Sequence, residues 1–143
     1  MQAKPAVLVT RKLPDAVEAR LLRDYDARLN PGDVLYTADG IVERARDVDA
    51  ILPCHTERFD AALIARLPAR VRIIANFSVG YDHVDVAEAK ARGIVVTNTP
   101  DVLSDATAEL TMMLMLGAAR RASEGERLVR SGEWKDWSPA FMV

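Results

Sequence analysis

The residues best suited to chemistry lie at 76–85, where three small residues separate an apolar run from a helical pattern. The backbone N–H groups of Val79 and Gly80 can face outward from such a turn, and a helix N-terminus behind them would favour an anion. Gly80 also lets the backbone approach a ligand closely. The segment therefore predicts a niche for a small carboxylate, although a glycine-containing turn equally serves chain geometry alone.

Two other groups of side chains carry reactive chemistry but are poorly arranged for it. Cys54 and His55 could form a nucleophile and its base, yet adjacent residues at a strand end point in different directions. Cys54 is better interpreted as a small apolar filler. Asp82, His83 and Asp85 do not make a recognised ligand set, so no metal site is predicted. Asp82 is interpreted as a helix N-cap, and His83 as a surface residue of the first helical turn.

Apolar runs alternate with helical patterns over the first hundred residues, and these elements must position the turn. Strand, helix and strand in regular succession favour a parallel sheet with helices on both faces. Five such strands indicate a flavodoxin-like, doubly wound α/β domain. Val17, Leu21 and Leu22 have the helical spacing of a buried face, and Gly93 stands where a helix should end. The predicted strands cover 6–10, 26–30, 50–52, 71–77 and 94–97, and the predicted helices cover 14–23, 38–46, a segment capped by Asp60, and 84–92.

The pattern changes after Pro100, where residues 104–121 are predicted to form one long helix with Ser104 as its N-cap. The stretch 110–116 is apolar nearly all round, and a helix of this kind is covered on every side. One small sheet covers only one side, so a second domain or a second chain must lie against it. A further helix is predicted at 123–130, and the aromatic tail at 132–143 needs a partner surface.

Composition narrows the class of partner. The 143 residues have a formal net charge of −2, 28% of them are charged, and no basic stripe is present. A nucleic-acid partner is therefore not expected. The longest apolar stretch, at 112–119, is far shorter than a membrane span. The single cysteine cannot form an internal disulfide, which favours a reducing compartment, and we expect a cytoplasmic protein.

Three segments, at 76–85, 93–100 and 104–110, together resemble the D-isomer-specific 2-hydroxyacid dehydrogenases. Residues 7–14 and 134–139 are similar to those of the glyoxylate/hydroxypyruvate reductases within that family. The similarity extends over essentially the whole chain, in order and at the family's spacing. It implies an NAD(P)H-dependent oxidoreductase that reduces small 2-oxoacids, such as glyoxylate and hydroxypyruvate, to D-2-hydroxyacids.

The resemblance also implies which residues bind the substrate. The main-chain amides of Val79 and Gly80 would hold the substrate carboxylate. The loop with Cys54 and His55 would line the same pocket. Trp137 of the partner subunit would reach into the pocket across a dimer interface.

The cofactor, NAD or NADP, would be bound mainly by a domain that follows these residues. A dinucleotide site needs a G-x-G-x-x-G turn, and no two of the seven glycines are separated by a single residue. Ser78 and Thr107 would lie near the nicotinamide end of the cofactor. In the family, the glycine-rich turn and the catalytic Arg, Glu and His come after the position of Val143. No catalytic residue is therefore assigned in this chain, and residues 1–143 alone are expected to be inactive.

The resemblance divides the chain into three parts. Residues 1–100 would form the flavodoxin-like substrate-binding domain, 101–122 an interdomain linker helix, and 123–143 a dimerisation arm, while the nucleotide-binding Rossmann domain is absent. A homodimer would form through the linker helix and the arm. One alternative from a different class stays open, because a fold does not fix a function. It is a non-enzymatic module, derived from the same fold, that binds a small anion or serves dimerisation and regulation.

Overall fold

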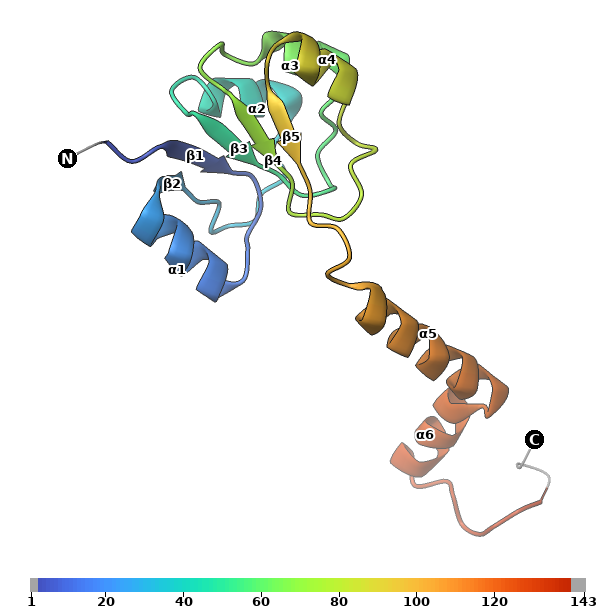
Figure 1. Cartoon of the computed structure of the whole chain (residues 1–143). Helices are drawn as coiled ribbons and strands as arrows, with labels where there is room; N and C mark the ends of the chain where they lie inside the picture. The colour runs from blue at the N-terminus through green and yellow to red at the C-terminus, as the bar shows by residue number, and fades with distance from the viewer. Residues whose placement is uncertain (1–2, 140–143) are drawn as a thin grey trace. The chain divides into compact units, whose positions relative to one another are not determined.

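The computed structural model describes residues 3–139 (Figure 1). Internal contacts divide the chain into two compact units, Met1–Pro100 and Asp101–Val143. Within the described residues, the first unit contains a sheet and four helices, and the second unit contains two helices. The last part of the predicted aromatic tail, at 140–143, lies outside the described residues.

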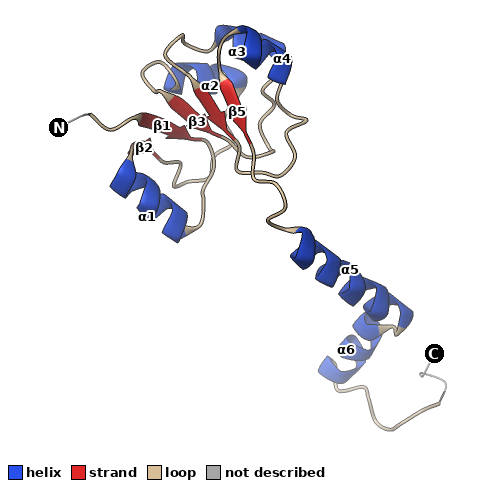
Figure 2. Cartoon of the chain, viewed as in Figure 1, coloured by secondary structure: helices blue, strands red, loops and turns tan. Residues whose placement is uncertain are grey.

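The first unit is built on a five-stranded parallel sheet in the order β2-β1-β3-β4-β5 (Figure 2). The central strands are rich in aliphatic residues, which suits strands buried on both faces. In the middle of the sheet, Leu8 is aligned with Arg28 on one side and with Ile51 on the other. The predicted five-stranded parallel α/β fold is confirmed. The strands are β1 (Ala6–Val9), β2 (Asp26–Arg28), β3 (Ala50–Leu52), β4 (Ile73–Ala75) and β5 (Val95–Thr97).

Helices pack on both faces of the sheet and form two cores of unequal size. The larger core lies under α2, α3 and α4, where Ile41, Ile51 and Ile64 are fully buried. The smaller core lies under α1, where Leu21 packs with Val7. The helices of this unit are α1 (Asp15–Asp24), α2 (Ala38–Arg44), α3 (Ala61–Arg66) and α4 (Val86–Ala91).

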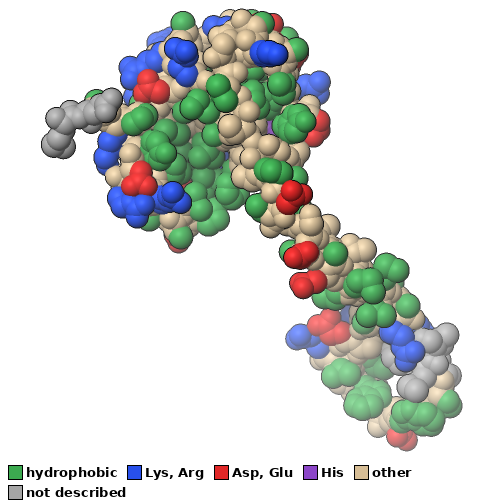
Figure 3. All heavy atoms as spheres, in the orientation of Figure 1, with side chains coloured by type: hydrophobic (Ala, Val, Ile, Leu, Met, Phe, Trp, Pro, Cys, Tyr) green, Lys and Arg blue, Asp and Glu red, His purple; other side chains and the backbone are tan. Residues whose placement is uncertain are grey.

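The face of the sheet beneath α1 is only partly covered. Ile73 on β4 and Val95 on β5 are aligned neighbours, and they are 40% and 56% exposed. The smaller core reaches from α1 to β1, β2 and β3 but does not include β4 or β5. Figure 3 shows hydrophobic side chains gathered on the surface of this unit. The sheet therefore has one complete helical layer and one partial layer.

Helix α4 begins two residues later than the sequence predicts, because Val84 forms an isolated parallel bridge with Phe59. The N-cap is Asp85, whose carboxylate accepts a hydrogen bond from the backbone N–H of Glu88 at 2.9 Å. The interpretation of Asp82 as the N-cap is wrong, since Asp82 lies in the turn before the bridge. The bridge keeps this part of the chain extended and delays the helix.

Helix α1 buries a narrow stripe of residues. Leu21 is 8% exposed, whereas Leu22 is 53% exposed. Glu18 shares the stripe, and its carboxylate accepts a hydrogen bond from the N–H of Leu13 at 3.0 Å. The prediction that Leu22 lies on the buried face is wrong. Successive helical residues are turned by about 100° around the helix axis. When Leu21 faces the sheet, Leu22 therefore points to the side of α1, where no other described element covers it.

The second unit contains one long helix followed by a shorter one, as predicted. Arg121 has a left-handed φ of 51° and separates them. Ser104 is not the N-cap, because the N–H of Thr107 closes the first turn on the carbonyl of Leu103 at 2.9 Å. The helices are α5 (Ser104–Ala119) and α6 (Ala122–Arg130).

Helix α5 exposes apolar side chains on all sides. None of its residues is buried, and Leu110, Met113 and Leu116 are 52%, 60% and 61% exposed. Soluble monomeric proteins rarely expose a contiguous apolar surface of this kind. No helix in the part of the chain that the structure describes is long and apolar enough to cross a membrane.

The adjacent leucines of α1 allow a matched test of the fold. Leu21→Ala removes a buried side chain and is expected to lower the free energy of unfolding by about 2–5 kcal/mol. Leu22→Ala makes the same chemical change on the exposed side and should alter it by less than about 0.5 kcal/mol. Urea denaturation followed by circular dichroism measures both. Equal losses would contradict the orientation of α1.

Candidate functional site

Three loops meet at the carboxyl edge of the sheet, which is where open α/β sheets bind ligands. The backbone N–H of Phe77, after β4, donates to the carbonyl of Pro53, after β3, at 2.8 Å. The N–H of Thr99, after β5, donates to the carbonyl of Ser78 at 3.0 Å. The turn at 78–80 is therefore held between the loop that follows β3 and the segment that follows β5.

The turn after β4 uses its carbonyl groups inside the protein and leaves two amide groups open. The carbonyls of Ser78 and Val79 both accept hydrogen bonds from the segment after β5, and Val79 does so from the Asn98 side chain at 2.8 Å. The carbonyl of Gly80 accepts from the Ser78 hydroxyl at 2.6 Å. Among the described residues, the N–H groups of Val79 and Gly80 donate to no protein group. Successive open N–H groups of this kind make an anion-binding concavity.

Helix α4 does not contribute to this niche. Five residues lie between Gly80 and its first residue, and the helix is six residues long. Its first turn is already capped by the carboxylate of Asp85. The prediction that a helix N-terminus lies directly behind the turn is wrong. An anion at this place would be held by the peptide groups of the turn itself.

Gly80 provides space and not an unusual backbone conformation. The glycines with positive φ among the described residues are Gly93, which ends α4 as predicted, and Gly132. A Cβ atom at position 80 would lie 3.1 Å from a carboxylate oxygen of Asp82, closer than ordinary van der Waals contact. The missing side chain leaves the backbone of the turn uncovered, so that a ligand can approach it closely.

His83 connects the segment after the turn to the end of β4. Its Nε2 lies 3.0 Å from Oδ1 of Asn76, whose Nδ2 donates to the carbonyl of Thr97 at 3.0 Å. Because Oδ1 can only accept, the imidazole donates from Nε2. Burial lowers the pKa of His83, which favours its neutral form. The prediction of a surface residue in the first helical turn is wrong, because His83 lies in the turn that precedes α4 and is partly buried.

The acidic residues near His83 serve local structure. The carboxylate of Asp85 caps α4, and Asp82 lies beside Gly80 in the turn. Nowhere in residues 3–139 do three His, Cys, Asp or Glu side chains come together in a way that could hold a metal ion. Around His83, the groups left for chemistry are therefore the peptide groups of the turn and the imidazole itself.

The loop after β3 contains the other predicted contact residues. Cys54 is partly buried against the smaller core, and burial raises the pKa of its thiol. A raised pKa disfavours the thiolate, which is the reactive form of cysteine. His55 is exposed. The hydrogen bond between Phe77 and Pro53 places this loop beside the turn, and its contribution to a pocket stays a prediction.

A network of polar side chains at the same edge was not found from the sequence. Arg11 donates to both carboxylate oxygens of Asp33, from Nε at 2.7 Å and from Nη2 at 2.9 Å. It also donates from Nη1 to the Thr56 hydroxyl at 2.7 Å, and that hydroxyl donates to the buried Glu57 at 3.1 Å. The pairing with Arg11 holds the pKa of the Asp33 carboxyl well below its usual range. The sequence offered one signal for this network, the charged residue Arg11 directly after the first predicted strand.

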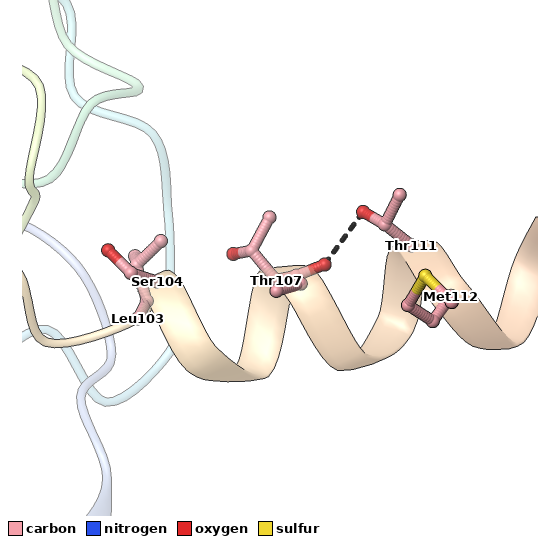
Figure 4. Close-up of a pocket in the computed structure, with 6 residues that line it drawn as sticks. Leu103, Ser104, Thr107, Thr111 and Met112 are labelled. Carbon is pink, nitrogen blue, oxygen red and sulfur yellow. Dashed lines mark hydrogen bonds between the residues drawn. The ribbon is translucent and has the colours of Figure 1, made fainter.

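Two residues with predicted roles lie in the second unit. The carbonyl of Thr107 accepts a hydrogen bond from the Thr111 hydroxyl at 2.7 Å (Figure 4). Trp137 is 65% exposed. Ser78 belongs to the first unit, so the joint roles of Ser78, Thr107 and Trp137 stay predictions. The groove around Thr107 is also lined by Leu103, Ser104, Ala108, Thr111 and Met112.

Comparison with known proteins identifies the family. The model of the D-isomer specific 2-hydroxyacid dehydrogenase catalytic domain matches residues 7–137. The chain belongs to the D-isomer specific 2-hydroxyacid dehydrogenase family. The family resemblance found in the sequence is thereby confirmed.

The curated relatives of this chain include a glycerate dehydrogenase and glyoxylate reductases. The glycerate dehydrogenase of Hyphomicrobium methylovorum is 40% identical over 141 residues, which cover 99% of this chain and 44% of the relative. The glyoxylate reductase of Thermococcus gammatolerans is 44% identical over 144 residues, with 98% and 43% covered. The chain thus spans less than half the length of these relatives.

Solved structures of the dehydrogenase family have the same fold. A Polaromonas sp. JS6 66 protein assigned to the D-isomer specific 2-hydroxyacid dehydrogenases has a TM-score of 0.89 and 42% identity, covering 99% of this chain and 44% of that one. The NADPH-dependent glyoxylate/hydroxypyruvate reductase of Sinorhizobium meliloti has a TM-score of 0.75 and 34% identity, covering 96% and 43%. That reductase was solved in complex with NADP and malonate.

Alkylation of the single cysteine tests the electrostatic environment of the loop after β3. Because burial raises the pKa of Cys54, we expect the folded chain to react with iodoacetamide more slowly than the urea-unfolded chain near neutral pH. The rate in the folded chain should rise with pH around a midpoint above that of an ordinary thiol. Mass spectrometry follows the reaction, with Cys54→Ser as the unreactive control. Equal rates for the folded and unfolded chains would contradict this account.

Proposed function

We propose that this chain supplies the substrate-binding part of a D-2-hydroxyacid dehydrogenase that reduces small 2-oxoacids such as glyoxylate and hydroxypyruvate. The observation that carries the proposal is the turn after β4, where Val79 and Gly80 offer two adjacent N–H groups at the carboxyl edge. Every 2-oxoacid has a carboxylate, whose two oxygens match two neighbouring donors. The names of the relatives, glyoxylate reductase and glycerate dehydrogenase, support this substrate class.

In this proposal the residues of the chain bind and orient the substrate. Holding the carboxylate fixes the direction of the adjacent keto group, and positioning of this kind lowers the entropic part of a reaction barrier. The loop with Cys54 and His55 would line the pocket, and the hydrogen bond from Phe77 to Pro53 supports that placement. Cys54 would contribute an uncharged contact, because its raised pKa keeps the thiol protonated.

We further propose NAD or NADP as the cofactor, which supplies the hydride when bound. Ser78 fits the nicotinamide end, since its hydroxyl donates to the Gly80 carbonyl and its lone pairs stay available to an amide N–H. Thr107 would lie near the same end of the cofactor. No G-x-G-x-x-G turn occurs among the 143 residues, so the dinucleotide would be bound mainly elsewhere in the complete protein. No catalytic acid or base is assigned to this chain.

The proposal also assigns a compartment. Cys54 is a free thiol. Free cysteines persist in reducing compartments, and this supports a cytoplasmic location.

The proposed organisation has residues 1–100 as the substrate-binding domain, 101–122 as the linker helix and 123–143 as the dimerisation arm. The apolar surface of α5 supports a homodimer through the helix and the arm, because such a surface is stabilised by burial. In this arrangement Trp137 of the partner subunit would reach the substrate pocket.

The dimer can be tested by a charge placed on α5. Leu114 is 60% exposed in the single chain, and Leu114→Glu would bury a carboxylate in the proposed interface. We expect the mass of the particle, measured by light scattering after size exclusion, to change from that of a dimer to that of a monomer. Leu22→Glu, at an exposed site of α1, is the matched control and should remain dimeric. A monomeric parent chain would refute the proposed interface.

The enzymatic proposal is tested on the complete protein that contains this chain. We expect it to oxidise NADH or NADPH when glyoxylate or hydroxypyruvate is added, seen as a loss of reduced-cofactor absorbance. Residues 1–143 alone should show no turnover, because the glycine-rich cofactor turn is missing from them. Turnover by this fragment would contradict the proposal that the cofactor is bound mainly by another part of the complete protein. Carboxylate binding by the complete protein without turnover would instead support the non-enzymatic anion-binding module.

A further inference from the structure

The segment that follows β5 fixes the direction of two peptide groups in the turn that follows β4. Two groups of this segment bond to two successive carbonyls of the turn. The backbone N–H of Thr99 donates to the carbonyl of Ser78 at 3.0 Å, and Nδ2 of Asn98 donates to the carbonyl of Val79 at 2.8 Å. The two donors are neighbours in sequence, so both carbonyls are drawn to the same side of the turn.

The direction of these carbonyls fixes the direction of the amide groups. A trans peptide unit is planar, and its C=O and N–H point in opposite directions. No described peptide bond is cis. The carbonyl of Ser78 shares a peptide unit with the N–H of Val79, and the carbonyl of Val79 shares one with the N–H of Gly80. Both N–H groups are therefore turned away from the segment after β5, on a common side where one carboxylate can meet both.

The two anchors differ in what they require of the sequence. The donor of Thr99 is a main-chain group, which almost any residue would supply. The donor of Asn98 is a side-chain amide, so it depends on the identity of that residue. The peptide unit that Asn98 holds ends at Gly80, and a glycine has the greatest freedom to rotate away from a required conformation. The side-chain anchor thus acts on the peptide unit that most needs one.

We infer that Asn98 is a positioning residue, which acts through the Val79 carbonyl to aim the N–H of Gly80 at the carboxylate of the substrate. The inference rests on the proposed function of the turn. It assigns to Asn98 no contact with the substrate. Without the Nδ2 donor, the peptide between Val79 and Gly80 is free to rotate, and the second of the two amide donors is lost for part of the time.

The test measures carboxylate binding by the complete protein with its cofactor bound. The probe is oxamate, a carboxylate that hydride does not reduce. In Asn98→Ala we expect the Kd for oxamate to rise roughly tenfold, because one charge-assisted hydrogen bond loses its orientation. The KM for glyoxylate should rise by a similar factor while kcat changes little, as expected when uniform binding is lost. In the parent protein the amide NMR signals of Val79 and Gly80 should shift on titration, and in the variant the shift of Gly80 should diminish.

A second variant guards against simple misfolding. Asn98→Asp has nearly the same shape but offers an acceptor in place of the donor, and it should bind oxamate more weakly than Asn98→Ala. The control is Arg70→Gln, which breaks an Arg–Asp pair beside the amino ends of β3 and β4. Its Kd for oxamate should equal that of the parent protein.

The outcomes separate this inference from the proposed function. If oxamate fails to shift the amide signals of Val79 and Gly80 in the parent protein, the proposed carboxylate site is refuted and the inference with it. If the parent protein binds oxamate through these amides, but both Asn98 variants bind it equally well, only the role of Asn98 is refuted. If Asn98→Ala does not fold, the affinity of Asn98→Asp decides between the two results.

Discussion

The candidate site depends on the opposed directions of C=O and N–H within each peptide unit. A turn that bonds its carbonyls to the protein must present its N–H groups on the other side. The turn after β4 does this with Ser78 and Val79, whose carbonyls are held by the segment after β5. In the proposed site, an anion would therefore meet the peptide N–H groups of the turn and not a helix N-terminus. The site needs three strand ends to be held in register.

The parallel sheet supplies that register. Strands β3, β4 and β5 are adjacent, and the loops after them are joined by main-chain hydrogen bonds that continue beyond the paired residues. On the outer side of β3, Arg11 and Asp33 add a bidentate pair that also holds Thr56. Asp33 has a left-handed φ of 49°, which aspartate tolerates better than most residues because its side chain can bond locally. The same carboxylate accepts the N–H of Lys12 at 2.9 Å.

Two apolar surfaces set this chain apart from a self-sufficient domain. One is the partly covered face of the sheet at Ile73 and Val95, and the other is the whole circumference of α5. Soluble monomers rarely expose contiguous apolar surface of this kind. This chain spans less than half the length of its family relatives. The relatives therefore contain further residues that could cover surfaces of this kind.

The sequence by itself determined the order of the elements, the parallel α/β class, the family and the turn at 78–80. These follow from local periodicity, from glycine positions such as Gly93, and from motifs at fixed spacing. An acidic residue three positions before Glu88 was also a local signal, and it would have identified Asp85 as the cap of α4. Only the tertiary structure decided that Leu22 faces solvent and that His83 turns inward to Asn76. It also decided that Arg11 meets Asp33 and that Asn98 meets Val79. These contacts join residues that are distant in sequence or depend on how far a neighbouring layer extends, and a local pattern does not encode either.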